Sequence, residues 1–207
     1  MVGYTFKQYD SRWGRKNYNG SSTMAAAGCG PTACACDIYA INTKITPWTT
    51  AQFMKSHGYA IRNNGTAWAG IPACLKHFGM KDVAEQSTMS KAFEKMQKGY
   101  LSVILFRGGT KGGVTWTLGG HYLATTGYKT KDGKHYLYMR DPGGRNHDGW
   151  FCYETQMRGL VAAIWTCTYD ASQVVIPKPK AKGAYSGSYP TATISKHTGT
   201  KTNTTRW

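Results

Sequence analysis

The stretch Gly28-Cys29-Gly30-Pro31-Thr32-Ala33 opens a segment, residues 30–41, whose pattern predicts a helix. Proline is tolerated in the first turn of a helix, and the glycines allow other backbone or a substrate to come close. A cysteine at this end of a helix meets partial positive charge, which favours the thiolate. The stretch therefore predicts either a cysteine nucleophile or a buried structural cysteine in a glycine-rich turn.

Outward from this stretch, the chain passes from helical to strand-forming patterns. Further helices are expected over residues 49–57, 67–78 and 90–98. Strands are expected over residues 101–106, 121–128, 135–141 and 161–169. The sequence Lys131-Asp132-Gly133-Lys134 is typical of a hairpin turn between two of these strands. Helices followed by an antiparallel sheet predict the α+β class.

The composition narrows the possible classes of protein and partner. The chain has 207 residues, of which 41% are hydrophobic, so wholesale disorder is excluded. No apolar run is long enough to predict a membrane span. The 26 Lys and Arg outnumber the 10 Asp and Glu, giving a formal net charge of +16. A polyanion is therefore the expected partner: nucleic acid, teichoic acid or the carboxylates of a bacterial wall.

The composition changes near residue 170, so residues 1–170 are expected to form one domain. Residues 171–207 contain Lys and Arg but no Asp or Glu, and begin with the stiff basic run Pro177-Lys178-Pro179-Lys180-Ala181-Lys182. The Ser/Thr-rich remainder is expected to be a linker or tail that leads to a further, missing part of the protein. No secretory signal is visible at the N-terminus.

The six cysteines are expected to be mostly reduced thiols, because they lie in apolar segments without a dense disulfide framework. Cys34 and Cys36 point to different faces of a helix, and the only other candidate ligand pair is Cys74 with His77. We expect no metal and no cofactor.

A cysteine nucleophile needs a base, an orienting group and donors for an oxyanion. His121 follows Gly119-Gly120 at the start of an expected strand, where its backbone is fixed and its ring is accessible. Asp141 ends the partner strand of the expected hairpin, 20 residues later, so it lies within reach of His121. Gln8 and the backbone N–H of Cys29 are the candidate oxyanion donors.

Five segments together resemble one family: Gln8-Tyr9-Asp10-Ser11-Arg12-Trp13-Gly14, Gly28-Cys29-Gly30-Pro31-Thr32-Ala33, Gly65-Thr66-Ala67-Trp68, Gly120-His121-Tyr122 and Arg140-Asp141-Pro142. They are similar to papain-like cysteine peptidases of the bacteriocin double-glycine leader peptidase type, over residues 4 to about 168. The resemblance implies a papain-like fold, in which a cysteine-bearing helix packs on an antiparallel sheet. It also implies roles for four residues: nucleophile (Cys29), base and acid (His121), orienting carboxylate (Asp141) and oxyanion donor (Gln8).

We therefore expect a monomeric cysteine endopeptidase that cleaves peptidoglycan peptides, as endolysins and autolysins do, at the cell wall or outside the cell. The basic charge would attract anionic wall polymers. The tail from Tyr185 to Trp207 is similar to linkers that lead into cell-wall-binding domains of clostridial and phage lytic enzymes, which implies that residues 171–207 lead to such a domain. The lack of a visible secretory signal fits a phage enzyme made in the host cytoplasm and released to the wall. Trp68, Trp116 and Trp150 are candidate substrate-cleft residues, with core packing as the alternative for each. Two other functions stay open: cleavage of double-glycine leader peptides or another acyl transfer, and non-enzymatic binding of nucleic acid. The dispersed basic residues and the lack of a recognition motif disfavour nucleic acid.

Overall fold

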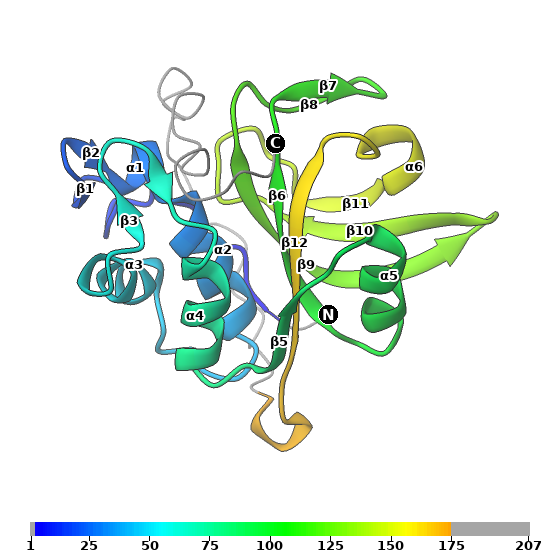
Figure 1. Ribbon diagram of the computed structural model, residues 1–207, viewed down its shortest axis with the longest axis horizontal. Coiled ribbons are helices and arrows are strands. Elements are labelled where there is room, and N and C mark those ends of the chain that lie inside the picture. Colours follow the sequence, from blue (N-terminus) through cyan, green and yellow to red (C-terminus); the bar gives the residue numbers. More distant parts are fainter. Residues whose placement is uncertain (1–2, 175–207) are drawn as a thin grey trace.

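A computed structural model describes residues 3–174 and places a helical half beside an antiparallel sheet (Figure 1). The helices are α1 (Met24–Ala27), α2 (Cys29–Ile38), α3 (Pro47–Ser56), α4 (Gly70–His77), α5 (Met89–Gln97) and α6 (Tyr153–Gln156), followed by a short 3-10 turn (Ala171–Gln173). This arrangement confirms the predicted α+β class and the cysteine-bearing helix packed on a sheet.

The main sheet has six strands in the order β11-β10-β9-β6-β12-β5, all antiparallel to their neighbours. Its strands are β5 (Lys81–Glu85), β6 (Leu101–Phe106), β9 (His121–Lys131), β10 (Lys134–Arg140), β11 (Gly149–Cys152) and β12 (Val161–Thr168). Three two-stranded ribbons accompany it: β1 (Asn17–Asn19) with β2 (Ser22–Thr23), β3 (Ala60–Ile61) with β4 (Gly65–Thr66), and β7 (Gly109–Lys111) with β8 (Val114–Thr117).

The apolar run of strand β6 is continuous because β6 lies in the middle of the sheet. All of its residues are buried, because both faces of the sheet are covered. Val103 and Leu105 lie in the core that the sheet shares with α2, whereas Ile104 and Phe106 lie in the core on the α5 side. The sheet therefore separates two hydrophobic cores, and the first of them anchors α2.

The hairpin between β9 and β10 forms as predicted. Asp132 and Gly133 have φ angles of 52° and 69°, the left-handed pair that a two-residue hairpin turn of type I′ requires. Helix α3 begins two residues earlier than predicted, because Thr46 caps it and Pro47 occupies its first turn. These local signals therefore set where the elements begin and turn.

The sequence did not predict the strands β5 and β11 or the three two-stranded ribbons. In β5 only Val83 is buried, and its charged neighbours conceal the strand pattern. Both β5 and β11 lie at the edges of the sheet, where pairing with one neighbour defines the strand. No helix within residues 3–174 has the length and apolar character to cross a membrane. The predicted linker or tail lies, from residue 175 onward, outside the described residues.

Candidate active site

Cys29 is the first residue of α2, a helix whose residues are all buried. Both flanking glycines are required by close contacts. A Cβ on Gly30 would lie 2.5 Å from Thr66 Oγ1, and one on Gly28 would lie 2.6 Å from the Met24 carbonyl oxygen. The glycines therefore let the start of α2 press against β4 and α1, and the helix N-terminus surrounds Cys29 with partial positive charge.

His121 begins β9, opposite Phe106 of β6, and only 4% of its surface is exposed. Its Nε2 lies 2.7 Å from Asp141 Oδ1. Burial opposes a positive charge on the ring, but the Asp141 carboxylate outweighs it. That carboxylate, its hydrogen bond and the neighbouring Cys29 thiol raise the pKa of His121 to about 10. The imidazole is therefore protonated at neutral pH, between a carboxylate and a thiol.

Asp141 reaches His121 because of the hairpin register. Arg140, the last residue of β10, pairs with Ala124 of β9, three residues from His121. The next residue, Asp141, is therefore carried to the start of β9, where His121 stands. Sequence spacing predicted this juxtaposition, and the structure has it.

The Asp141 carboxylate is fully buried and accepts four hydrogen bonds. Oδ1 accepts one from His121 and one from the Gly143 backbone N–H at 2.7 Å. Oδ2 lies 3.2 Å from the backbone N of His147 and 3.0 Å from its Nδ1. Burial alone would raise the pKa of Asp141, but the His121 charge and these hydrogen bonds hold it well below its usual range.

His147 was missed from the sequence, which places it in a polar turn with no strand or motif around it. Its role depends on the turn that follows β10, which folds back and brings the ring to Asp141. The same turn is anchored by Lys7, whose Nζ donates to the Asp141 carbonyl oxygen and to Asp148 Oδ2, both at 2.7 Å. Asp148 Oδ1 also accepts from the Asp141 backbone N–H at 2.8 Å.

Gln8 is buried between the two halves, with 1% of its surface exposed. Its backbone N–H donates to the Pro142 carbonyl oxygen at 2.9 Å, beside Asp141. Its side-chain Nε2 donates to the Ala25 carbonyl oxygen at 2.8 Å, in the helix that precedes Cys29. An amide nitrogen has two hydrogens, so one remains for a further acceptor. Gln8 therefore joins the turn that carries Asp141 to the segment that carries Cys29.

The model of the Peptidase_C39 like family matches residues 6–173, a range that includes all of these site residues. The chain belongs to this family. The C39-like peptidase is therefore a cysteine peptidase, and so a hydrolase, as its motifs predicted. Its fold is similar to a crystal structure from Bacillus anthracis described as that of a C39-like peptidase. The match has a TM-score of 0.53 and 13% identity, covering 80% of this chain and 94% of that chain. No curated protein matches the sequence.

The C39-like peptidase has a pocket of about 350 Å³ between its two halves. Trp68 lines it from the helical half, and residues 161–164 of β12 line it from the sheet. Val161 is opposite Phe106, which is opposite His121, so this end of β12 is two strands from His121. Neighbouring strands lie about 4.8 Å apart, which places the pocket wall about 10 Å from the His121 backbone. Trp68 thus lines the pocket with the 4% of its surface that is exposed, and its contact with substrate stays a prediction.

The other two tryptophans do not line this cleft, which corrects the sequence-based prediction. Trp116 has no exposed surface, because its ring stacks on Phe106 with centroids 4.4 Å apart in the core on the α5 side. Trp150 is 38% exposed but lies on the edge strand β11, opposite Tyr138, which in turn pairs with Gly127. Gly127 is six residues along β9 from His121, or about 20 Å at the usual rise per residue.

The six cysteines are all buried and free. Cys36 accepts a hydrogen bond from the Phe6 backbone N–H at 3.4 Å, and burial raises its pKa to about 12. Burial likewise raises the pKa of Cys34 and of Cys167 well above the ordinary value. Within residues 3–174, no group of three or more His, Cys, Asp or Glu is arranged to hold a metal ion.

Proposed function

We propose that this C39-like peptidase is an endopeptidase of bacterial peptidoglycan, with Cys29 as nucleophile, His121 as acid and base, Asp141 as orienting carboxylate and Gln8 as oxyanion donor. The observation that carries the proposal is the position of His121. Its ring is held by Asp141 at 2.7 Å, and the Cys29 thiol at the start of a buried helix helps to keep it protonated. A thiol and an imidazolium in this arrangement are suited to acyl transfer.

The reaction follows from these groups. The Cys29 thiolate attacks the carbonyl carbon of a peptide bond, and the C–N bond breaks as His121 gives its proton to the leaving amine. The Cys29 backbone N–H and the second Gln8 amide hydrogen donate to the oxyanion. Water then attacks the thioester while His121 takes up a proton from it. The C–S bond breaks, which releases a carboxylic acid and restores the Cys29 thiolate and the His121 imidazolium.

The choice of peptidoglycan rests on charge and on the cleft. A net charge of +16 would hold the enzyme on an anionic wall, where the substrate is an abundant peptide. The pocket beside Trp68 also contains Glu85, Gln86, Ser87 and Thr88, polar side chains suited to a hydrophilic peptide. We propose action at the wall, in the manner of an endolysin or autolysin, by a monomer. Residues 171–207 would serve as the basic linker or tail.

The test is digestion of purified Gram-positive peptidoglycan by the wild type and by Cys29→Ala, with mass spectrometry of the soluble products. New amine termini made only by the wild type would support the proposal and identify the bond that is cleaved. A matched assay with a double-glycine leader peptide separates the alternative substrate. Cleavage of the leader with no peptidoglycan product would overturn the wall assignment, and equal products from Cys29→Ala would overturn the nucleophile.

A further inference from the structure

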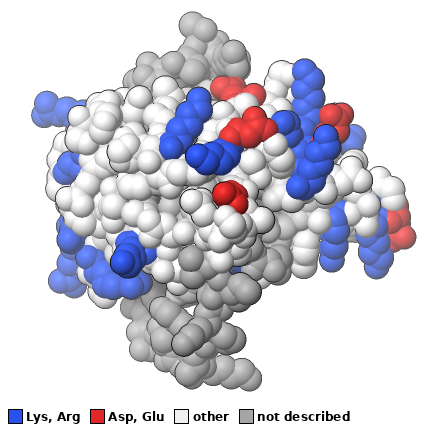
Figure 2. Space-filling view, turned by 90° about the horizontal axis from the view of Figure 1, so that it is seen from below, with Lys and Arg blue, Asp and Glu red and all other residues white. Residues whose placement is uncertain are grey.

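The surface charge of this protein is divided unequally between its two halves. From Ser11 to Met80, the segment that builds the helical half, the only acidic residue is Asp37, which is fully buried. The cations of the segment are Arg12, Arg15, Lys16, Lys44, Lys55, Arg62 and Lys76. Figure 2 shows Lys and Arg side chains without Asp or Glu over the outer part of this half (left), and acidic side chains towards the middle and the sheet.

Most of these cations have no acidic partner. Arg12 pairs with Asp10 at 2.7 Å. Within residues 3–174, none of the other six forms an ion pair. An unneutralised set of this kind attracts an anion that carries repeated charges.

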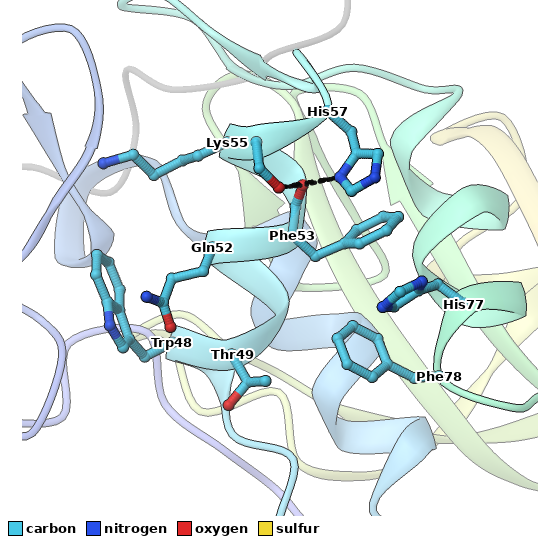
Figure 3. A pocket seen from close by; sticks show the side chains of 9 residues that line it. Trp48, Thr49, Gln52, Phe53, Lys55, His57, His77 and Phe78 are labelled. Atoms are coloured by element: carbon cyan, nitrogen blue, oxygen red, sulfur yellow. Dashed lines mark hydrogen bonds between the residues drawn. The ribbon is translucent and has the colours of Figure 1, made fainter.

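A groove of about 770 Å³ lies on the outer side of α3, within this basic half (Figure 3). Its wall includes Trp48, Phe53, Lys55, His57, His77 and Phe78. The inner side of α3 faces α2, since Thr50 Oγ1 donates to the Pro31 carbonyl oxygen at 2.8 Å. The groove and the candidate active site are therefore separate features, with α3 and α2 between them.

The aromatic side chains of the groove pack against one another and against two lysines. Phe53 is stacked against His57 and His77, with ring centroids 4.2 Å and 4.4 Å away. At the other end, the Nζ atoms of Lys16 and Lys55 lie 4.7 Å and 5.7 Å from the centroid of the Trp48 ring. The groove therefore combines an aromatic cluster with two ammonium groups, which can donate charge-assisted hydrogen bonds to the phosphates of a polymer. Because the enzyme is proposed to act at the cell wall, a phosphate polymer of the wall is the expected ligand.

We propose that this groove binds a phosphodiester-linked polyol or sugar polymer of the bacterial wall, a teichoic acid, with Lys16 and Lys55 on its phosphates. The proposal rests on the proposed wall function for the choice of polymer, but not on the catalytic residues. Binding on the outer side of α3 leaves the cleft between the two halves open to peptide. The helical half would thus hold the enzyme on the wall while the cleft acts on the substrate.

The test measures the Kd for poly(glycerol phosphate) at fixed salt, in the full chain with Cys29→Ala so that no peptide is cleaved. The double variant Lys16→Gln/Lys55→Gln should weaken binding about tenfold or more, since charge-assisted contacts to phosphate are lost. The matched control is Lys131→Gln/Lys134→Gln, which removes equal charge from exposed lysines beside the β9–β10 turn. It should change the Kd less than about twofold.

Three results would overturn the proposal: no binding by the parent protein, equal weakening in both double variants, or equally tight binding of single-stranded DNA through the same two lysines. The first two exclude the groove as a site, and the third assigns it to nucleic acid. Hydrolysis is measured separately, in proteins that retain Cys29. Loss of polymer binding with unchanged cleavage of a soluble stem peptide supports the groove, whereas absent cleavage with intact polymer binding refutes the endopeptidase alone.

Discussion

Replacing Asp141 with Asn removes the charge that keeps His121 protonated, while the side chain keeps nearly the same shape. The rise in the pKa of His121 from 6.5 to about 10 corresponds to about 5 kcal/mol, at about 1.4 kcal/mol per pKa unit. Two unit charges about 4 Å apart at an effective dielectric constant of about 20 attract by about 4 kcal/mol, which accounts for most of it. Without the carboxylate, burial is the largest effect on the pKa of His121 and outweighs the support from Cys29, so we expect this pKa to fall to 6.5 or below.

The Asn side chain of Asp141→Asn would also place a hydrogen-bond donor against a backbone donor. Each oxygen of Asp141 accepts from a backbone N–H, Oδ1 from Gly143 and Oδ2 from His147. An Asn side chain in either orientation therefore turns its NH₂ group against one of these donors. The unpaired groups should cost roughly 1–3 kcal/mol of unfolding free energy, which urea unfolding at pH 7 would measure.

The assay is an NMR titration of the six histidines, with His121 assigned from its absence in His121→Gln. In the wild type, the stabilisation from the raised pKa of His121 is complete below pH 6.5 and is lost as the pH rises through about 10. The lowered pKa of Asp141 stabilises the folded protein fully above pH 3.8, the ordinary value of this carboxyl. This stabilisation is lost as the pH falls below 3.8. Asp141→Asn should remove both dependences.

The kcat/KM of Asp141→Asn should fall because the pKa of His121 falls. With a pKa of 6.5 or below, at most roughly a tenth of His121 is protonated at pH 7.5, so kcat/KM should fall at least about tenfold there. The alkaline limb of the pH profile should move from near 10 to below 7, and the loss should stay smaller than that in His121→Ala. A His121 pKa near 10 in Asp141→Asn would refute the reasoning, because the charge of Asp141 would then not be its cause.

Three further substitutions test other contacts. Gly30→Ala places a Cβ 2.5 Å from Thr66 Oγ1, so unfolding free energy and activity should fall together. Thr66→Gly in the same chain should restore activity but only part of the unfolding free energy, because the buried Tyr18 hydroxyl loses its hydrogen-bond partner. No loss in the single variant would contradict the contact. His147→Ala removes one hydrogen bond to Asp141 and should lower unfolding free energy by about 1–3 kcal/mol in urea, with a smaller shift of the alkaline limb than Asp141→Asn; an equal shift would make His147 as important as the carboxylate. Burial raises the pKa of Asp37 well above its usual range, and neither carboxyl oxygen has a hydrogen-bond partner among the described residues. Its contribution to stability is therefore present at acid pH and lost as the pH rises above 3.8, so Asp37→Asn should be more stable than the wild type at pH 8 and equal to it below about pH 4. An equal unfolding free energy at pH 8 would show that Asp37 is not held neutral.

The sequence alone determined the elements that local chemistry specifies. A glycine-flanked cysteine with a following proline marks the start of α2, and Asp132-Gly133 specifies a tight hairpin. From that hairpin the encounter of His121 and Asp141 follows to within a residue, because a two-residue turn fixes the pairing beside it. A bulge between Tyr138 and Met139 then shifts the register by one residue, which the sequence did not predict. These features depend on residues close in the chain, where propensity and turn geometry act directly.

Only the tertiary structure decided which side chains become neighbours when neither a turn nor a helix or strand pattern connects them in the sequence. His147 reaches Asp141 through the fold of an irregular turn, and Trp116 is buried because β8 lies over Phe106. Trp150 is remote from His121 because β11 joins the far edge of the sheet. Lys16 and Lys55, which form no ion pair within residues 3–174, likewise come together beside Trp48 only when residues 11–80 have folded into the helical half. Packing and strand order create such neighbours, since both depend on the whole chain rather than on the residues beside each position.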